Sequence, residues 1–320
     1  METILITGGT GLIGKRLTSL LLQNGYSVIV LTRNKIEASE NFKLEDPQST
    51  GYHNLSFAEW NVKEQTIDRT AVEKADYIIH LAGAGVADKR WSDKRKKEIA
   101  ESRTKSGALI VKALSENSHH VKAVVSASAI GWYGPDPSVP NLKPFVESDE
   151  PNDDFLGQTC LQWEQSIEPV QKMNVRLVKL RTGIVLSNEG GALEEFRKPL
   201  RFGLSTILGS GSQVVSWIHI DDLCRMYMQA MHDEKMQGAY NAVATHPISN
   251  KKLNETLAVK QRGRFYIPIY VPSFVLKMVL GEMSIEVLKS TTVSNEKMRK
   301  AGFQFIFPDV EKAIADLINN

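Results

Sequence analysis

Three glycines near the start of the chain have the residue type and the spacing that bind phosphate groups. Gly8, Gly11 and Gly14 follow the strand-like run 4–7, and leucines then recur at helical spacing over 17–22. Glycine lets the backbone turn sharply and approach an anion closely, and the helix that follows offers free N–H groups and a partial positive charge. The chemistry that this pattern predicts is the binding of a pyrophosphate group.

The segments around this turn are those that a dinucleotide-binding unit requires. Asn24 and Gly25 predict the end of the helix, and the apolar run 27–32 predicts a second buried strand. A strand, a glycine turn, a helix and a second strand, in this order, are the context in which a glycine pattern indicates dinucleotide binding. The alternative is a glycine-rich turn that binds nothing.

The end of the second strand predicts which dinucleotide is bound. NAD-selective proteins of this kind place an acidic residue there, on the ribose 2′-hydroxyl. Residues 31–34 read Leu-Thr-Arg-Asn and contain no acid. The Arg33 guanidinium could instead pair with a 2′-phosphate through charge-assisted hydrogen bonds. We therefore expect NADP(H) rather than NAD(H), with a solvated surface arginine as the alternative.

Motifs spread over the whole chain resemble one protein superfamily. The spacing of the glycine turn is similar to that of the short-chain dehydrogenase/reductases, and within them to the extended, epimerase-like branch. The other matching segments are 126–128, 133–134, 218–222, 90–92, 190–193, 238–242 and 293–308. Together they resemble the uncharacterised epimerase-family proteins that are sometimes labelled cell-division-inhibitor-like nucleotide-sugar epimerases.

The resemblance implies where the cofactor residues lie. They come from the glycine turn, from the ends of the following strands and from the long helix that begins after Ser92. Leu81 stands where the superfamily carries Asn, and Arg103 is near the position of an Asn in its proton relay. The implied cofactor set is Gly8, Thr10, Gly11, Leu12, Ile13, Arg33, Asn61, Val62, Leu81, Ala82, Gly83, Arg103, Ser126, Arg181 and Gly183.

The residues that transfer the proton in this superfamily are missing. Its members place a Tyr and a Lys four residues apart on a helix, because the Lys cation lowers the pKa of the phenol from about 10. None of the 8 tyrosines of this chain has a Lys four residues later. Glu164 matches a glutamate that relatives carry after the Lys, and this register puts Leu156 and Cys160 in the two positions. The standard mechanism is therefore absent.

Other residues remain candidates for the chemistry. The resemblance places Ser128 where extended-branch enzymes bind the substrate oxygen. The candidates for moving a proton are Tyr133, Cys160, Asp154 and His219. Two of them have plainer interpretations. A cysteine on a helix is usually a small buried hydrophobe, and the motif around His219 is explained if Asp221 caps the next helix.

The composition excludes several other classes of protein. The chain has 320 residues with 39 Lys+Arg and 37 Asp+Glu, so its net charge of +2 lacks the basic excess of a nucleic-acid-binding protein. The two cysteines, Cys160 and Cys224, cannot build a disulfide framework or a sulfur-ligated metal cluster. No segment resembles a secretion signal or reaches the about 20 apolar residues that span a membrane. We expect a reduced, cytoplasmic monomer or homodimer without metal, nucleic-acid or membrane partners.

The element pattern predicts an α/β fold with a Rossmann-type, doubly wound parallel sheet covered by helices on both faces. Residues 34–56 are expected to form an irregular surface excursion. We expect residues 1–185 to form the NADP(H)-binding domain and residues 186–320 a smaller substrate-binding portion. The two are expected to interleave, because the strand after the Ser128 loop returns to the sheet.

Two functions are compatible with these residues. The first is an NADP(H)-dependent epimerase, dehydratase or reductase that acts on a polar small molecule such as a nucleotide sugar. The second is a non-catalytic NADP(H)-binding sensor or interaction protein, which the missing Tyr/Lys pair suggests. The sequence does not identify the substrate.

Overall fold

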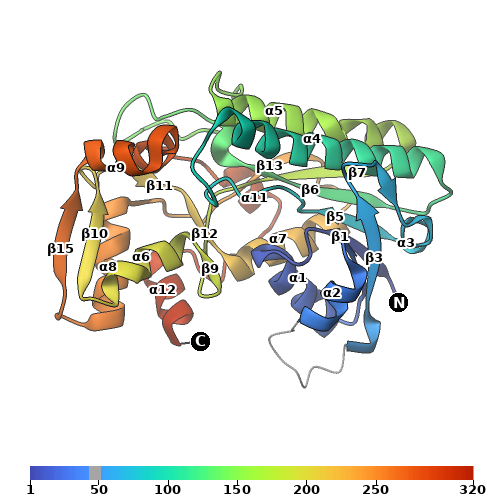
Figure 1. The fold of residues 1–320 in the computed structure, drawn as a ribbon, viewed down its shortest axis with the longest axis horizontal. Coiled ribbons are helices and arrows are strands. Elements are labelled where there is room, and N and C mark those ends of the chain that lie inside the picture. Colours follow the sequence, from blue (N-terminus) through green and yellow to red (C-terminus); the bar gives the residue numbers. More distant parts are fainter. Residues whose placement is uncertain (43–51, 320) are drawn as a thin grey trace.

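An eight-stranded sheet forms the larger body of the molecule (Figure 1). The computed structural model describes residues 1–42 and 52–319. The strands lie in the order β13-β7-β6-β5-β1-β2-β3-β4, and all are parallel to their neighbours except the short β4. Their bounds are β1 Thr3–Thr7, β2 Ser27–Thr32, β3 Leu55–Asn61, β4 Thr66–Ile67, β5 Tyr77–His80, β6 Ala123–Ala129, β7 Arg176–Thr182 and β13 Gly238–Ala242. This confirms the predicted doubly wound α/β fold.

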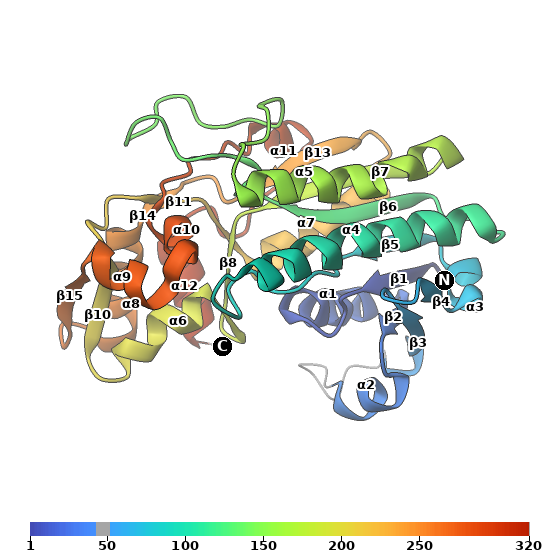
Figure 2. The same ribbon diagram turned by 45° about the horizontal axis from the view of Figure 1, so that its top comes forward.

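Apolar side chains bury both faces of the sheet. In β1, Ile4 and Ile6 contribute to one core and Leu5 to the other, and each of the three is at most 1% exposed. Such continuous apolar strands are typical of parallel sheets that are covered by helices on both sides. The helices that cover the sheet are α1 Leu12–Gln23, α2 Lys35–Asn41 and α7 Ile220–His232 on one face, and α3 Arg69–Lys74, α4 Asp93–Glu116 and α5 Phe155–Ile167 on the other (Figures 1 and 2).

A smaller lobe lies beyond one end of the sheet (Figure 2). Its core packs the indole of Trp217 with Leu253 and Ile314, all of which are fully buried. Its strands are β8 Ile184–Ser187, β9 Gly190–Gly191, β10 Leu204–Leu208, β11 Val214–Val215, β12 Trp217–His219, β14 Ile248–Ser249 and β15 Ile267–Val271. Its helices are α6 Ala192–Leu200, α8 Asn250–Arg262, α9 Ser273–Leu280, α10 Ser284–Leu288 and α12 Val310–Asn319, while the short α11 Glu296–Lys300 packs near β13.

The chain passes between the two bodies more than once. After β7 it enters the lobe through β8, and it then returns to the sheet with α7 and β13 before it completes the lobe. Residues 220–242 therefore belong in space with the sheet. The predicted domain boundary near residue 185 stays a proposal. In this proposal, residues 220–242 are part of the first domain.

The structure corrects two predictions about where helices begin. Residues 34–56 are not wholly irregular, because the Asn34 side chain accepts the N–H of Glu37 at 3.2 Å and starts α2. Residues 43–51 of that stretch lie outside the described part. Asp221 is not the cap of α7, because the His219 ring accepts the N–H of Asp221 at 3.1 Å and the helix begins at Ile220. The long helix α4 begins after Ser92 as predicted, and the Ser92 side chain caps it.

No helix in the described part of the chain combines the length and the apolar character needed to cross a bilayer.

The fully buried carboxylate of Asp222 joins α7 to the segment that leads into α12. It accepts the N–H of Ile306 at 3.0 Å and of Phe307 at 2.9 Å, and it pairs with Arg225 at 2.8 Å. We predict that Asp222→Ala lowers the free energy of unfolding by about 3 kcal/mol, because it leaves buried donors without an acceptor. Denaturant titration measures this loss.

Its neighbour provides the matched control. Asp221 is 23% exposed in its side chain and pairs with Arg16 at 2.5 Å, so Asp221→Ala should cost less than about 1 kcal/mol. Equal losses in the two variants would contradict the anchoring role of Asp222.

Candidate functional site

The glycine turn leaves the start of α1 open to an anion. Gly8 has a φ of +68°, and the N–H of Gly11 donates to the carbonyl of Gly8 at 3.0 Å. Gly11 is the N-cap of α1, and no side chain caps the helix. The first N–H groups of a helix need an acceptor, so this end of α1 fits a phosphate group.

The glycines differ in what they do for the turn. A Cβ on Gly14 would lie 2.3 Å from the carbonyl oxygen of Gly8, and one on Gly8 would lie 2.9 Å from the carbonyl of Leu81. Both positions therefore need glycine for the fold itself. A Cβ on Gly11 would come no closer than 3.4 Å to the Gly8 carbonyl. The fold does not require glycine at position 11. A ligand that approaches the backbone closely would require it.

A buried chain of polar groups fixes the loop opposite this turn. The Thr7 hydroxyl accepts the N–H groups of Leu81 at 3.1 Å and of Ala82 at 3.2 Å. It lies 2.8 Å from His80 Nδ1, and His80 Nε2 lies 3.2 Å from the Ser106 hydroxyl. Burial lowers the pKa of His80 to about 3, so the ring is neutral. Thr7 thus donates to Nδ1, and Nε2–H donates to Ser106.

Arg103 brings a positive charge next to this loop. A Cβ on Gly83 would lie 3.2 Å from Arg103 Cζ, and Nη1 of Arg103 donates to the carbonyls of Ala84 at 2.9 Å and of Ile99 at 3.0 Å. The guanidinium also lies 4.9 Å from the ring centroid of Trp163 on α5. The structure therefore places Arg103 beside another of the predicted cofactor residues, Gly83.

The remaining predicted cofactor residues lie at the ends of strands. Arg33 follows β2 and is exposed, and it forms no hydrogen bond or ion pair with the described residues. Asn61 ends β3, where its side chain accepts the N–H groups of residues 63 and 64 at 3.0 and 3.1 Å. Val62 packs on the core beneath it. Thr10 is exposed in the turn itself, and Leu12 and Ile13 are half-buried in α1.

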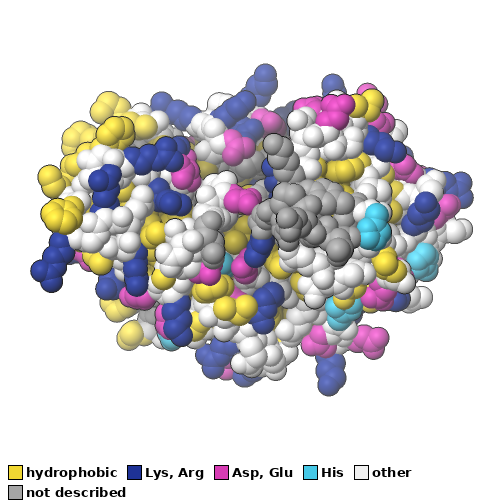
Figure 3. Space-filling view, turned by 90° about the horizontal axis from the view of Figure 1, so that it is seen from below, with side chains coloured by type: hydrophobic (Ala, Val, Ile, Leu, Met, Phe, Trp, Pro, Cys, Tyr) yellow, Lys and Arg dark blue, Asp and Glu magenta, His cyan; other side chains and the backbone are white. Residues whose placement is uncertain are grey.

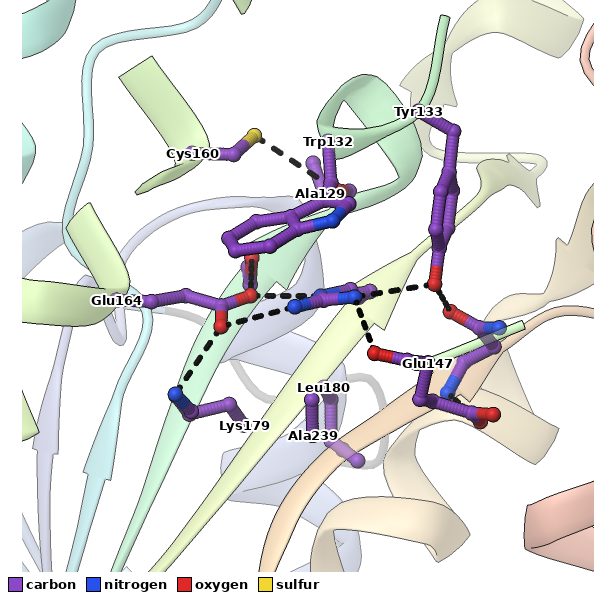
Figure 4. A network of polar contacts seen from close by, with 12 residues as sticks. Ala129, Trp132, Tyr133, Glu147, Cys160, Glu164, Lys179, Leu180 and Ala239 are labelled. Carbon is purple, nitrogen blue, oxygen red and sulfur yellow. Dashed lines mark hydrogen bonds and ion pairs between the residues drawn. The ribbon is translucent and has the colours of Figure 1, made fainter. Parts of the chain in front are cut away.

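A second polar cluster joins β6, β7 and α5, and we call it the Glu164 network: Ser128, Tyr133, Glu164, Lys179 and Arg181. In Figure 4 the labelled side chains of Glu164, Lys179 and Tyr133 point toward a common centre. Nε and Nη2 of Arg181 donate to the two oxygens of Glu164 at 2.8 and 3.2 Å. The guanidinium also lies 3.6 Å from the ring centroid of Trp132.

The buried carboxylate of Glu164 receives two further donors. The Ser128 hydroxyl donates to one oxygen at 2.8 Å, and Lys179 Nζ lies 3.1 Å from the other. Burial acts to raise the pKa of Glu164, but the hydrogen bond and charge of Arg181, together with Lys179, hold it below its usual value. Both oxygens of the carboxylate are thus satisfied within the protein.

This network gives two of the catalytic candidates structural partners. Ser128 is 2% exposed and directs its proton to Glu164. The Tyr133 hydroxyl donates to Asn241 at 2.7 Å and accepts from Arg181 at 3.2 Å, and burial raises its pKa to about 12. A catalytic role for either side chain stays a prediction. The guanidinium of Arg181, a predicted cofactor residue, is likewise hydrogen-bonded within the protein.

The helix α5 carries the two positions that lack the Tyr/Lys pair. Leu156 and Cys160 both face Gly131, whose added Cβ would lie 3.2 Å from the Leu156 Cβ and 3.6 Å from the Cys160 Sγ. Cys160 donates weakly to the carbonyl of Ala129 at 3.6 Å, and burial raises its pKa to about 12. The thiol is therefore protonated near neutral pH, as expected of a buried apolar cysteine.

The other candidates also make structural contacts. Asp154 caps α5 by accepting the N–H of Gly157 at 2.7 Å. His219 caps α7, and its ring stacks on Phe307 at 3.8 Å between centroids. Ser126 is buried in β6. Gly183, between β7 and β8, lies against Ser216, since a Cβ there would lie 2.4 Å from the Ser216 carbonyl oxygen.

Sequence reasoning missed His80 and Lys179. The sequence does contain a signal for Lys179. Lys179 and Arg181 are two residues apart in a strand, so their side chains share one face of the sheet. The pairing of β6 with β7 sets Ser128 opposite Arg181. The packing of α5 on these strands then brings Glu164 to both cations. In the described residues, no group of three or more His, Cys, Asp or Glu side chains could hold a metal.

Two family models match separate parts of the chain. Residues 4–242 match the model of the NAD dependent epimerase/dehydratase family, and residues 271–317 match a domain of unknown function, DUF1731. The chain is 32% identical to the epimerase family protein SSP1921 of Staphylococcus saprophyticus, with 100% of both chains covered. It is 31% identical to the epimerase family protein YfhF of Bacillus subtilis, with 98% of this chain and 97% of that protein covered.

Solved structures extend the likeness to the fold. Human epimerase family protein SDR39U1 with NADPH gives a TM-score of 0.82 at 27% identity and covers 99% of both chains. The UDP-glucose 4-epimerase of Thermotoga maritima with UDP-glucose gives a TM-score of 0.75 at 20% identity, covering 99% of this chain and 98% of the other. At that identity the second structure shows a shared fold alone.

The Glu164 network predicts a specific dependence of stability on pH. A carboxyl whose pKa is lower in the folded than in the unfolded chain stabilises the fold above its unfolded pKa of about 4.3, and this contribution is lost as the pH falls. We expect the free energy of unfolding of the wild type to fall more steeply below that pH than that of Glu164→Gln.

The variant should also be about 3 kcal/mol less stable at neutral pH, because it leaves Arg181 and Lys179 buried without their carboxylate. Denaturant titrations over a pH series measure both effects. Parallel pH profiles of the two proteins would contradict an ionised Glu164 in the fold.

Proposed function

Because this chain belongs to the NAD dependent epimerase/dehydratase family, we propose that it binds NADP(H) in the crevice above the glycine turn and acts there on a polar small molecule of the nucleotide-sugar class. The observation that carries the proposal is the start of α1, where Gly11 leaves an uncapped helix terminus open to a pyrophosphate. The human SDR39U1 structure supports the cofactor, since it contains NADPH, and the Thermotoga maritima structure, which shares the fold, contains UDP-glucose.

The choice of NADP(H) over NAD(H) rests on the end of β2. Arg33 is exposed there, and no carboxylate of the described residues pairs with it. Its guanidinium is therefore available to a 2′-phosphate, to which arginine can donate two parallel hydrogen bonds. Residues 31–34 carry no acid that would select a 2′-hydroxyl.

Each group of residues has a defined task in this proposal. The glycine turn and α1 bind the pyrophosphate, Asn61 and Val62 border the adenine, and the loop 81–83 leaves room for the cofactor. NADP(H), when bound, accepts or supplies a hydride. Arg103 adds a fixed positive charge beside that loop, where it would orient an anionic group.

A non-catalytic NADP(H) sensor is the second candidate, and a specific observation favours it. The two positions of the usual proton-transfer pair hold Leu156 and Cys160, and the buried thiol has a pKa of about 12. Ser128 and Tyr133 are held by the Glu164 network. The described side chains thus include no free phenol or ammonium at the place where the superfamily transfers its proton.

A spectroscopic assay separates the two candidates. The NADP⁺-loaded and the NADPH-loaded proteins are incubated with a panel of nucleotide sugars. The reduced-nicotinamide absorbance is followed together with the NMR spectrum of the sugar, because an epimerase regenerates its cofactor and leaves the absorbance unchanged. A change in the absorbance or in the sugar with one compound supports the enzyme. No change with any compound, combined with different conformations or partner binding in the two redox states, supports the sensor.

Arg33 predicts the cofactor preference directly. We expect Arg33→Ala to weaken NADPH binding by about 10- to 100-fold, the effect of losing a charge-assisted hydrogen bond, and to leave NADH binding unchanged. Isothermal titration with both nucleotides measures this. A wild type that binds NADH as tightly as NADPH would refute the assignment of Arg33.

Gly11 separates ligand binding from folding. Gly11→Ala should keep the thermal stability of the wild type, because the added Cβ comes no closer than 3.4 Å to the Gly8 carbonyl, yet it should weaken NADPH binding by at least tenfold. Gly14→Ala should unfold the turn, because its Cβ would lie 2.3 Å from that carbonyl. A Gly11→Ala variant with intact affinity would remove the observation on which the proposal rests.

A further inference from the structure

The lobe ends in an exposed apolar surface that the proposed crevice does not use. We call it the β15 face and define it by Phe202, Phe265, Ile267, Tyr270, Phe274 and Met278. Phe202 and Phe265 are 84% and 85% exposed, and the other four are at least 50% exposed. Isolated exposed hydrophobic residues are common on proteins, whereas several on adjacent elements mark an interaction site.

These six residues lie on neighbouring elements at one end of the molecule. Phe202 and Phe265 are in two turns that are joined where the N–H of Ile267 donates to the carbonyl of Gly203 at 2.9 Å. The strand β15 runs beside β10, and α9 follows it directly (Figure 1). Figure 3 shows hydrophobic and basic side chains at this end, on the left of the view.

The charge has one sign along the segment 256–281, which carries five of the six residues of the β15 face. Between Glu255 and Glu282 the sequence contains four cations and no carboxylate. Lys260, Arg264 and Lys277 are exposed, and none of the three forms an ion pair with the described residues. The face therefore combines apolar side chains with unneutralised positive charge.

We propose that the β15 face docks the protein on an anionic lipid bilayer. Aromatic and aliphatic side chains enter the headgroup region, and each Lys or Arg near an anionic leaflet adds about 1 kcal/mol of attraction. Phe202 and Phe265 protrude from turns rather than line a hollow, which suits insertion between lipids. We expected no membrane partner because the sequence has no membrane-spanning segment. Binding to the surface of a bilayer does not need such a segment.

A second copy of the chain fits this surface less well. Two such faces in contact would bring together the unpaired cations Lys260, Arg264 and Lys277 of both copies. Pairing of β15 with another strand is also disfavoured. Ile267 and Val271 direct their backbone groups to β10, so the outward positions are 268 and 270, and Pro268 has no N–H to donate.

Vesicle sedimentation of the full chain tests the proposal. We expect binding to vesicles that contain phosphatidylglycerol, weaker binding as salt is raised, and little binding to pure phosphatidylcholine. Phe202→Ser/Phe265→Ser and Arg264→Glu/Lys277→Glu should each weaken binding to the anionic vesicles by at least tenfold.

Matched controls lie elsewhere on the surface. Leu142 is 91% exposed and Lys235 is exposed, so Leu142→Ser and Lys235→Glu should bind like the wild type. Thermal unfolding checks that all variants fold. None of these readouts depends on nucleotide binding, so failure of the proposed function leaves the test valid.

Two results would overturn the proposal. One is equal binding to neutral and anionic vesicles, or no binding to either. The other is a dimer in sedimentation velocity that Phe202→Ser/Phe265→Ser dissociates, because a second copy would then occupy the face.

Discussion

The buried carboxylate of Glu164 is the interaction on which the geometry of the proposed crevice depends. It comes from α5, and it binds Arg181 and Lys179 of β7 together with Ser128 of β6. An uncompensated charge at this depth would cost several kcal/mol. The carboxylate therefore fixes the helix against two strands at the edge of the sheet where parallel strands end and ligands bind.

The same interaction explains why this crevice differs in chemistry from that of its superfamily. Side chains that could have moved a proton are used to satisfy the buried ions, and the helix positions of the usual pair hold Leu156 and Cys160. Arg103 lies near Cys160 and lowers the pKa of its thiol, but burial outweighs this effect. The region thus keeps the fold of its family while its polar groups stabilise that fold.

Much of the fold could be predicted because the chain marks its strands clearly. Apolar runs bounded by glycines predict β1 and β2, and the family match confirms the epimerase-like family that the glycine turn resembled. The short helix α2 was missed because its signal, the Asn34 cap, lies in a polar stretch without hydrophobic periodicity. His219 was not recognised as the cap of α7, because Asp221 is the more usual capping residue.

The candidate site was predictable only in part, for a physical reason. Residues of the glycine turn are close in sequence, so spacing alone places them. The Glu164 network is assembled from three elements, and only the pairing of β6 with β7 brings Ser128 opposite Arg181. Continuous apolar strands carry no information about which neighbour they pair with, since both of their faces are buried.

Native mass spectrometry of the protein as purified, and again after adding NADPH, tests the central claim that this crevice binds NADP(H). The account predicts a complex whose added mass is that of NADP⁺ or NADPH, and a second bound ligand would identify the substrate or product by its mass. Retention of NAD(H) in its place would contradict the assignment of Arg33. A protein that stays free of nucleotide even with added NADPH would contradict the account as a whole.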